Sequence, residues 1–181
     1  MKRLLCALAL VAGTAAPALA DPKSDLIAAM IQFARVTSYH VTATDHDKTV
    51  EMDMALPGKM HIMMGPVEMI KIDAVTWIKM NGSWHQFTVP GMDRITSGVT
   101  HAIDYASGKY GPNDMVVRDL GMMSPDGVPL HAYSVVTTSS KDAATLYLDK
   151  GGRLIRVDTS NGAIVRFSKF NAIDPIVPPP Q

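Results

Sequence analysis

The sequence predicts an α+β fold: one strongly curved antiparallel sheet, a half-barrel of about 11 strands, enclosing an N-terminal helix and an inserted helical segment. Three observations predict it. A helical apolar pattern is followed by six short segments of alternating polarity, joined by tight turns. A second helical pattern then interrupts the series, and five further strand-like segments complete the chain.

The N-terminal helix is expected from Pro22 to about Val36. Proline suits the first turn of a helix, where its missing N–H has no partner to lose. Five apolar residues recur at helical spacing, namely Leu26, Ile27, Met30, Ile31 and Ala34. The inserted helical segment is expected within residues 90–111, where Ile95, Val99, Ala102, Ile103 and Ala106 recur at three and four.

The strand predictions depend on period-two alternation between turn signals. The first six strands are expected at residues 39–44, 49–55, 59–64, 67–72, 75–80 and 83–87. Asn81-Gly82 is the dipeptide typical of a type I′ hairpin turn. The last five strands are expected at residues 115–120, 130–138, 143–149, 154–158 and 163–170. A proline-rich tail follows, and no linker divides the chain.

The first 20 residues have the pattern of a cleavable secretory signal. Lys2 and Arg3 precede an apolar run, and Ala18-Leu19-Ala20 ends in the small-residue pattern of a cleavage site. We therefore expect a signal peptide at residues 1–20 and one domain at residues 21–181. Cys6 is the single cysteine and lies near the start of the apolar run, so we expect no lipidation and no thiol in the exported chain.

Charge and motifs exclude several classes of function. Without Lys2 and Arg3 the 17 basic residues become 15, against 17 acidic ones, and no basic run is present, so nucleic acid is not an expected partner. No phosphate-binding loop, nucleophile elbow or zinc-protease motif occurs, so we expect neither an enzyme nor a cofactor. Asp45-His46-Asp47 has residue types used in catalysis, but it is predicted to form a solvated hairpin tip.

Methionine is the unusual component of the composition: the chain has 13 Met against four Phe. Many of them fall in the first six predicted strands, where most are expected to share one face with Val50, Ile62 and Trp77. Because its side chain is unbranched and polarizable, methionine repacks around ligands of varied shape. The candidate ligand-binding residues are Met52, Met54, Met60, Ile62, Met64, Met69, Trp77, Met80 and Trp84. The two tryptophans flank Asn81-Gly82, where they either pair across the hairpin or line the mouth of a cleft.

Two other interpretations of the methionines remain open. They can be ordinary core residues beneath a packed helix. They can also be thioether ligands for Cu(I), since Met52 and Met54 are two residues apart and Met60 to Met64 carries three methionines and His61. The six histidines form no closely spaced pair, however, and residues two apart on a strand lie about 7 Å apart. We expect no metal site.

Several segments resemble the LolA/LppX-type lipoprotein-carrier superfamily, the bacterial periplasmic half-barrels that shield lipid. The resemblance lies in the N-terminal helix running into residues 38–43, in Leu56-Pro57-Gly58-Lys59-Met60, in residues 69–78, and in residues 165–171 with the proline exit at Pro178-Pro179. It implies a periplasmic protein whose partner is a lipid, an acyl chain or a lipidated protein, with membrane-anchored donor or acceptor proteins. We expect a monomer.

One position departs from this superfamily. The lipoprotein carrier has an arginine before the proline that follows its second long strand, and that arginine helps to hold a helical lid; Leu56 stands at the matching position here. The resemblance therefore favours a carrier of apolar ligands over a dedicated lipoprotein chaperone. The competing interpretation is a non-enzymatic envelope interaction or sensing module whose cleft is filled by its own helices.

Overall fold

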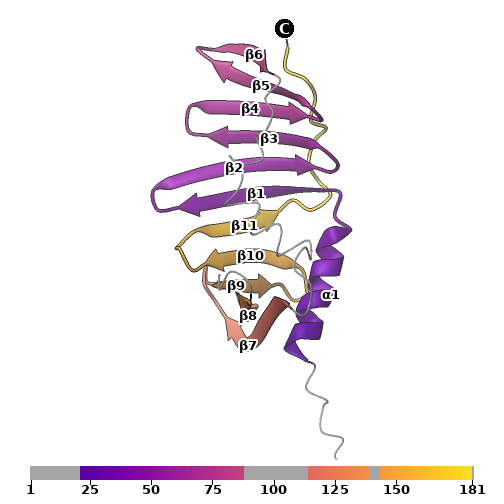
Figure 1. Cartoon of the computed structure of the whole chain (residues 1–181), viewed down its shortest axis with the longest axis vertical. Helices are drawn as coiled ribbons and strands as arrows, with labels where there is room; N and C mark the ends of the chain where they lie inside the picture. The colour runs from indigo at the N-terminus through magenta and orange to yellow at the C-terminus, as the bar shows by residue number, and fades with distance from the viewer. Residues whose placement is uncertain (1–20, 88–113, 139–142, 181) are drawn as a thin grey trace, which may run out of the picture.

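In the computed structural model, which describes residues 21–87, 114–138 and 143–180, all the strands belong to one antiparallel sheet (Figure 1). The order across the sheet is β6-β5-β4-β3-β2-β1-β11-β10-β9-β8-β7. The sheet is curved and does not close on itself within these residues, because β6 and β7 lie at its opposite ends. The predicted half-barrel is thereby confirmed.

The elements agree closely with the sequence predictions. The first part of the chain forms α1 (Pro22–Ala34), β1 (Ser38–Asp45), β2 (Lys48–Ala55), β3 (Lys59–Met64), β4 (Val67–Ile72), β5 (Val75–Met80) and β6 (Ser83–Phe87). The second part forms β7 (Met115–Met123), β8 (Leu130–Thr137), β9 (Ala143–Leu148), β10 (Leu154–Thr159) and β11 (Ile164–Ser168). β7 is three residues longer than expected. The helical segment expected at residues 90–111 lies outside the described residues.

Turn chemistry explains why the strands end where they do. Asn81 and Gly82 have φ values of 52° and 82°, the positive values that a type I′ turn requires. Asp45 and His46 lie at the β1–β2 tip with exposed side chains, and the His46 Nδ1 to Asp45 Oδ1 distance is 2.7 Å. The interpretation of Asp45-His46-Asp47 as a solvated turn is confirmed.

The pairing of β1 with β11 joins the two meanders into one sheet. Val41 on β1 lies opposite Met52 on β2 and Phe167 on β11. The segment after β11 is held to the start of β1, since the Asn171 backbone N–H donates to the Ser38 carbonyl at 2.7 Å and the Asn171 side chain accepts from the Thr37 N–H at 2.9 Å. The segment before β1 and the segment after β11 thus stabilise the centre of the sheet.

Helix α1 packs against one face of the sheet. Asp21 caps its N-terminus by accepting from the Lys23 N–H. The buried stripe consists of Leu26, Ala29, Met30 and Phe33, which share a core with β1, β2 and β7–β11. Of the predicted stripe, Ile27 is half-buried and two residues are exposed, Ile31 at 52% and Ala34. The helix is rotated so that Phe33, absent from the predicted stripe, enters an aromatic cluster with Tyr39 and Phe167.

On the face of the sheet opposite α1, the Asp126 carboxylate attaches the loop after β7 to β10 and β11. Asp126 accepts hydrogen bonds from Arg156 on β10 at 2.6 Å and from Arg166 on β11 at 2.9 and 3.0 Å. Arg156 also binds Asp158, at 2.6 and 3.0 Å, and its guanidinium lies over the Tyr147 ring. Hydrogen bonds from Arg166 and Arg156 hold the pKa of the Asp126 carboxyl well below its usual range.

This pKa shift predicts a pH-dependent effect of Asp126→Asn. A carboxyl whose pKa is lowered by folding stabilises the folded state above its unfolded pKa, near 3.8, and that contribution is lost as the pH falls through the folded value. We expect Asp126→Asn to be less stable than the wild type at pH 7, with the difference shrinking below about pH 4. Urea unfolding at several pH values measures this. Asp47→Asn at the β1–β2 tip is the control, and an Asp126→Asn deficit that persists unchanged to pH 2 contradicts the prediction.

Candidate ligand-binding face

The register of β1–β6 shows which side chains share a face. Residues directly opposite one another in an antiparallel pair project from the same side of the sheet, and successive residues alternate. One row of opposite residues crosses the sheet as Val41, Met52, Ile62, Met69, Ile78 and His85. Because Val41 and Met52 belong to the core that contains α1, this row lies on the inner face of the half-barrel.

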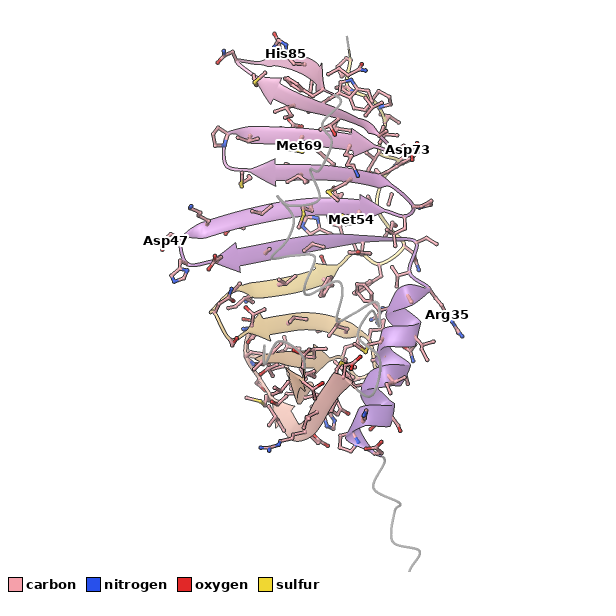
Figure 2. The ribbon with its side chains drawn as sticks, in the orientation of Figure 1. Arg35, Asp47, Met54, Met69, Asp73 and His85 are labelled. Atoms are coloured by element: carbon pink, nitrogen blue, oxygen red, sulfur yellow. The ribbon has the colours of Figure 1, made fainter. Side chains whose placement is uncertain are left out.

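Seven of the nine predicted site residues lie on this inner face. Met54 and Met60 are directly opposite each other, and Met52 is opposite Ile62, which is opposite Met69. Met64 and Met80 follow by alternation along β3 and β5. Figure 2 shows Met54 on β2 and Met69 on β4, with one strand between them. We call these seven residues the methionine face: Met52, Met54, Met60, Ile62, Met64, Met69 and Met80.

The two tryptophans lie on the other side of the sheet, so the prediction that Trp77 shares the face of the methionines is wrong. Trp77 is opposite Ile70 and Gln86, and Trp84 is opposite Lys79. They are not opposite each other either, and the Lys79 ammonium lies 5.5 Å from the centre of the Trp84 ring. Trp77 and Met80 are three residues apart on β5, so the alternation of side chains along that strand places them on opposite faces of the sheet.

Burial changes across the methionine face. Met52, Met54 and Met69 are buried, and Met60 and Ile62 are half-buried against the main core. Met64 and Met80, which lie at the β3–β4 and β5–β6 hairpin tips, are 43% and 42% exposed. An apolar surface therefore runs without interruption from the core of the protein to solvent.

Sequence reasoning missed three apolar members of the same face, Val67, Ile78 and Phe87; it placed Val50 on this face without naming it as a ligand-binding candidate. Val50 packs against the main core, and Val67 is opposite Met64. Alternation contained the signal for Val67 and Ile78, each two residues from a predicted member, whereas Phe87 is opposite Thr76 and had no such neighbour. The prediction was based on residue type and not on the parity of each strand.

Along β2–β6 the inner face carries no carboxylate; its one carboxylate on β1 is Asp45, which is exposed at the β1–β2 tip and lies opposite the exposed Lys48. Away from that tip the ionisable side chains of the inner face are Tyr39, Lys71 and His85, and burial raises the pKa of Tyr39 to about 12. The outer face of the same strands differs sharply. There Glu68 accepts from Lys79 at 2.8 Å and lies 3.1 Å from His61, and the Lys79 and His61 hydrogen bonds lower its pKa. His40 lies 2.7 Å from Asp53. The charged pairs of these strands that form hydrogen bonds across the sheet thus lie on the outer face.

The metal-binding interpretation gains no support from this arrangement. Among the described residues there is no group of three or more His, Cys, Asp or Glu side chains able to hold a metal ion. On the methionine face the only two methionines directly opposite each other are Met54 and Met60, while Ile62 lies between Met52 and Met69. In the described part of the chain no helix is long and apolar enough to cross a membrane.

An open antiparallel half-barrel with a helix packed inside it and an apolar inner surface is the LolA/LppX-like fold. Leu56, the position that departs from the carrier pattern, lies just after β2 with its apolar side chain 46% exposed. The position at which the resemblance leads one to expect an arginine therefore carries an exposed leucine.

Comparison of structures supports this fold, whereas comparison of sequences finds no relative: no family model and no curated protein matches the chain. The chain resembles LprF from Mycobacterium bovis with a TM-score of 0.65 at 12% identity, over 87% of this chain and 96% of LprF. A LolA superfamily protein from Nitrosomonas europaea matches at a TM-score of 0.36 and 10% identity, over 84% and 94% of the two chains. An uncharacterized conserved protein from Thermus thermophilus matches at 0.42 and 11%, over 83% and 89%.

Proposed function

We propose that this protein is a soluble periplasmic carrier or binding protein, without enzymatic activity, for a lipid, an acyl chain or a lipidated protein. The ligand lies against the methionine face and is held by burial of apolar surface. One observation carries the proposal: an apolar face free of carboxylates extends from the core to exposed methionines at the hairpin tips. Such a face needs an apolar occupant, because exposed contiguous apolar surface is costly in water.

Methionine suits a face that accepts more than one acyl shape. Each thioether side chain has three rotatable bonds and adapts to its neighbours with little strain. At roughly 25 cal/mol per Å², burial of about 400 Å² of an acyl chain contributes on the order of 10 kcal/mol before the cost of ordering the ligand. That amount supports useful affinity without a covalent bond.

Export is part of the proposal. Residues 1–20 have the pattern of a cleavable signal, and Cys6 precedes the cleavage site, so the exported chain is released unlipidated. Donor and acceptor proteins anchored in the two membranes then exchange ligand with a diffusing monomer. N-terminal mass spectrometry of protein recovered from the periplasm tests the cleavage site, which we place before Asp21.

A test of the methionine face compares two adjacent residues of β3 that project to opposite sides of the sheet. Ile62→Gln places an amide in the middle of the methionine face, and we expect it to weaken binding of a fluorescent fatty acid about tenfold, because an unpaired polar group is costly against apolar surface. Met63→Gln, on the outer face, is the matched control and should bind as the wild type does. Equal affinity of all three proteins would place the ligand elsewhere.

Recovery of lipid from the native protein tests the function itself. We expect native mass spectrometry of periplasmic protein to show a bound lipid. The absence of any co-purifying lipid, together with no uptake of the fluorescent fatty acid, favours the second candidate, an envelope interaction or sensing module with a self-filled cleft. The burial of Met52, Met54 and Met69 in the structure is the observation that favours this candidate.

A further inference from the structure

Apart from Lys48, which is exposed at the β1–β2 tip opposite Asp45, Lys71 is the one lysine on the inner face of β1–β6. It lies on β4 between Met60 on β3 and Thr76 on β5, directly opposite each of them. Met69 is two residues away on the same strand and on the same face. Lys71 is half-buried and shares the inner face with the methionines.

Among the described residues this ammonium has no anionic partner. The inner face of β2–β6 carries no carboxylate, and Asp45 on β1 lies opposite Lys48 at the β1–β2 tip. No described residue forms an ion pair or hydrogen bond with the Lys71 side chain. Lys79 on the next strand shows the usual arrangement, since its Nζ lies 2.8 Å from Glu68 on the outer face. A half-buried lysine without a counter-ion on an apolar surface is complementary to an anion with an apolar body.

We infer that the ligand is an anionic amphiphile whose carboxylate or phosphate head group binds the Lys71 ammonium while its chain lies on the methionine face. This inference rests on the function proposed above and narrows its ligand class. A chain that starts at Lys71 and follows β4 passes Met69 and reaches Val67, four residues or about 13 Å away. There Val67 and the exposed Met64 lie opposite each other at the hairpin tip. Apart from Asp45 and Lys48 at the β1–β2 tip, the remaining ionisable groups of the inner face are Tyr39 and His85, and His85 lies on β6, opposite Ile78.

The test compares an acid with its neutral ester on the full exported chain. We expect wild-type protein to bind cis-parinaric acid about tenfold more tightly than methyl parinarate, because only the acid pairs with the ammonium. Lys71→Met should weaken binding of the acid about tenfold and leave the ester unchanged, which removes the preference. Lys71→Arg should restore it. Lys59→Met, on the outer face of the neighbouring strand, is the matched control and should keep the wild-type preference.

Competition experiments distinguish the two head groups. Dodecanoate and dodecyl phosphate should each displace cis-parinaric acid from the wild type, and the one that loses more affinity in Lys71→Met identifies the natural head group. A Lys71→Met variant that keeps the full preference for the acid overturns the inference and leaves the carrier function standing. If wild-type protein binds neither the acid nor the ester, the carrier function fails, and the ligand class fails with it.

Discussion

Replacement of Phe33 by alanine should lower the free energy of unfolding by about 3–5 kcal/mol, the range for truncation of a buried phenylalanine. The Phe33 ring lies 5.1 Å from the Tyr39 ring, 5.0 Å from Phe167 and 6.2 Å from Phe170, measured between ring centres. These three rings belong to β1, β11 and the segment after β11, so Phe33 attaches α1 to the centre of the sheet. Urea unfolding followed by far-UV circular dichroism measures the change.

Ile31→Ala is the matched control on the same helix. Ile31 is 52% exposed, so its truncation should cost no more than about 0.5 kcal/mol. A Phe33→Ala deficit as small as that of Ile31→Ala would mean that the aromatic cluster does not hold the helix. The same variants also report on ligand binding, because a displaced α1 would loosen the core against which Met60 and Ile62 pack.

Replacement of Arg156 by methionine should cost about 2–3 kcal/mol. The guanidinium is buried and binds two carboxylates, so its removal leaves Asp126 and Asp158 without their shared partner. Burial opposes the charge of Arg156, but the hydrogen bonds to Asp158 and Asp126 outweigh it and raise its pKa. We place the effect below that of a fully buried pair because both carboxylates are partly exposed to water. Thermal or urea unfolding at pH 7 measures the loss.

Arg166→Met separates the contribution of burial from that of charge. Arg166 shares Asp126 with Arg156, but its side chain is 39% exposed. Its removal should therefore cost less than about 1 kcal/mol. Equal losses in the two variants would show that the network acts through net charge and not through the buried guanidinium.

Much of the fold was predictable because it depends on local signals. Alternating polarity located the strands to within a few residues, and Asn81-Gly82 located the β5–β6 turn through its positive φ values. The outer ion network gave no such signal. Asp126 and Arg156 are 30 residues apart in the chain, and they meet because β10 and the loop after β7 share the outer side of the sheet.

The candidate site was predictable in part. The concentration of methionine in β2–β5 indicated an apolar surface, and seven of the nine residues named from the sequence share a face. The tryptophans were placed with them on chemical type, although parity along β5 separates Trp77 from Met80. Lys71 was not singled out, since an isolated lysine in a strand indicates a binding site only when the face that it occupies is known.

By itself, the sequence determined where the strands and turns lie, which residues alternate along each strand, and that methionine supplies an unusual share of the apolar side chains. Only the tertiary structure decided which side of each strand is the inner one. Alternation divides a strand into two sets of residues but does not say which set faces the core. That choice depends on pairing between distant segments, above all of β1 with β11, and on the side of the sheet where α1 packs. These contacts place the methionines and Lys71 inside and leave Trp77 and Trp84 outside.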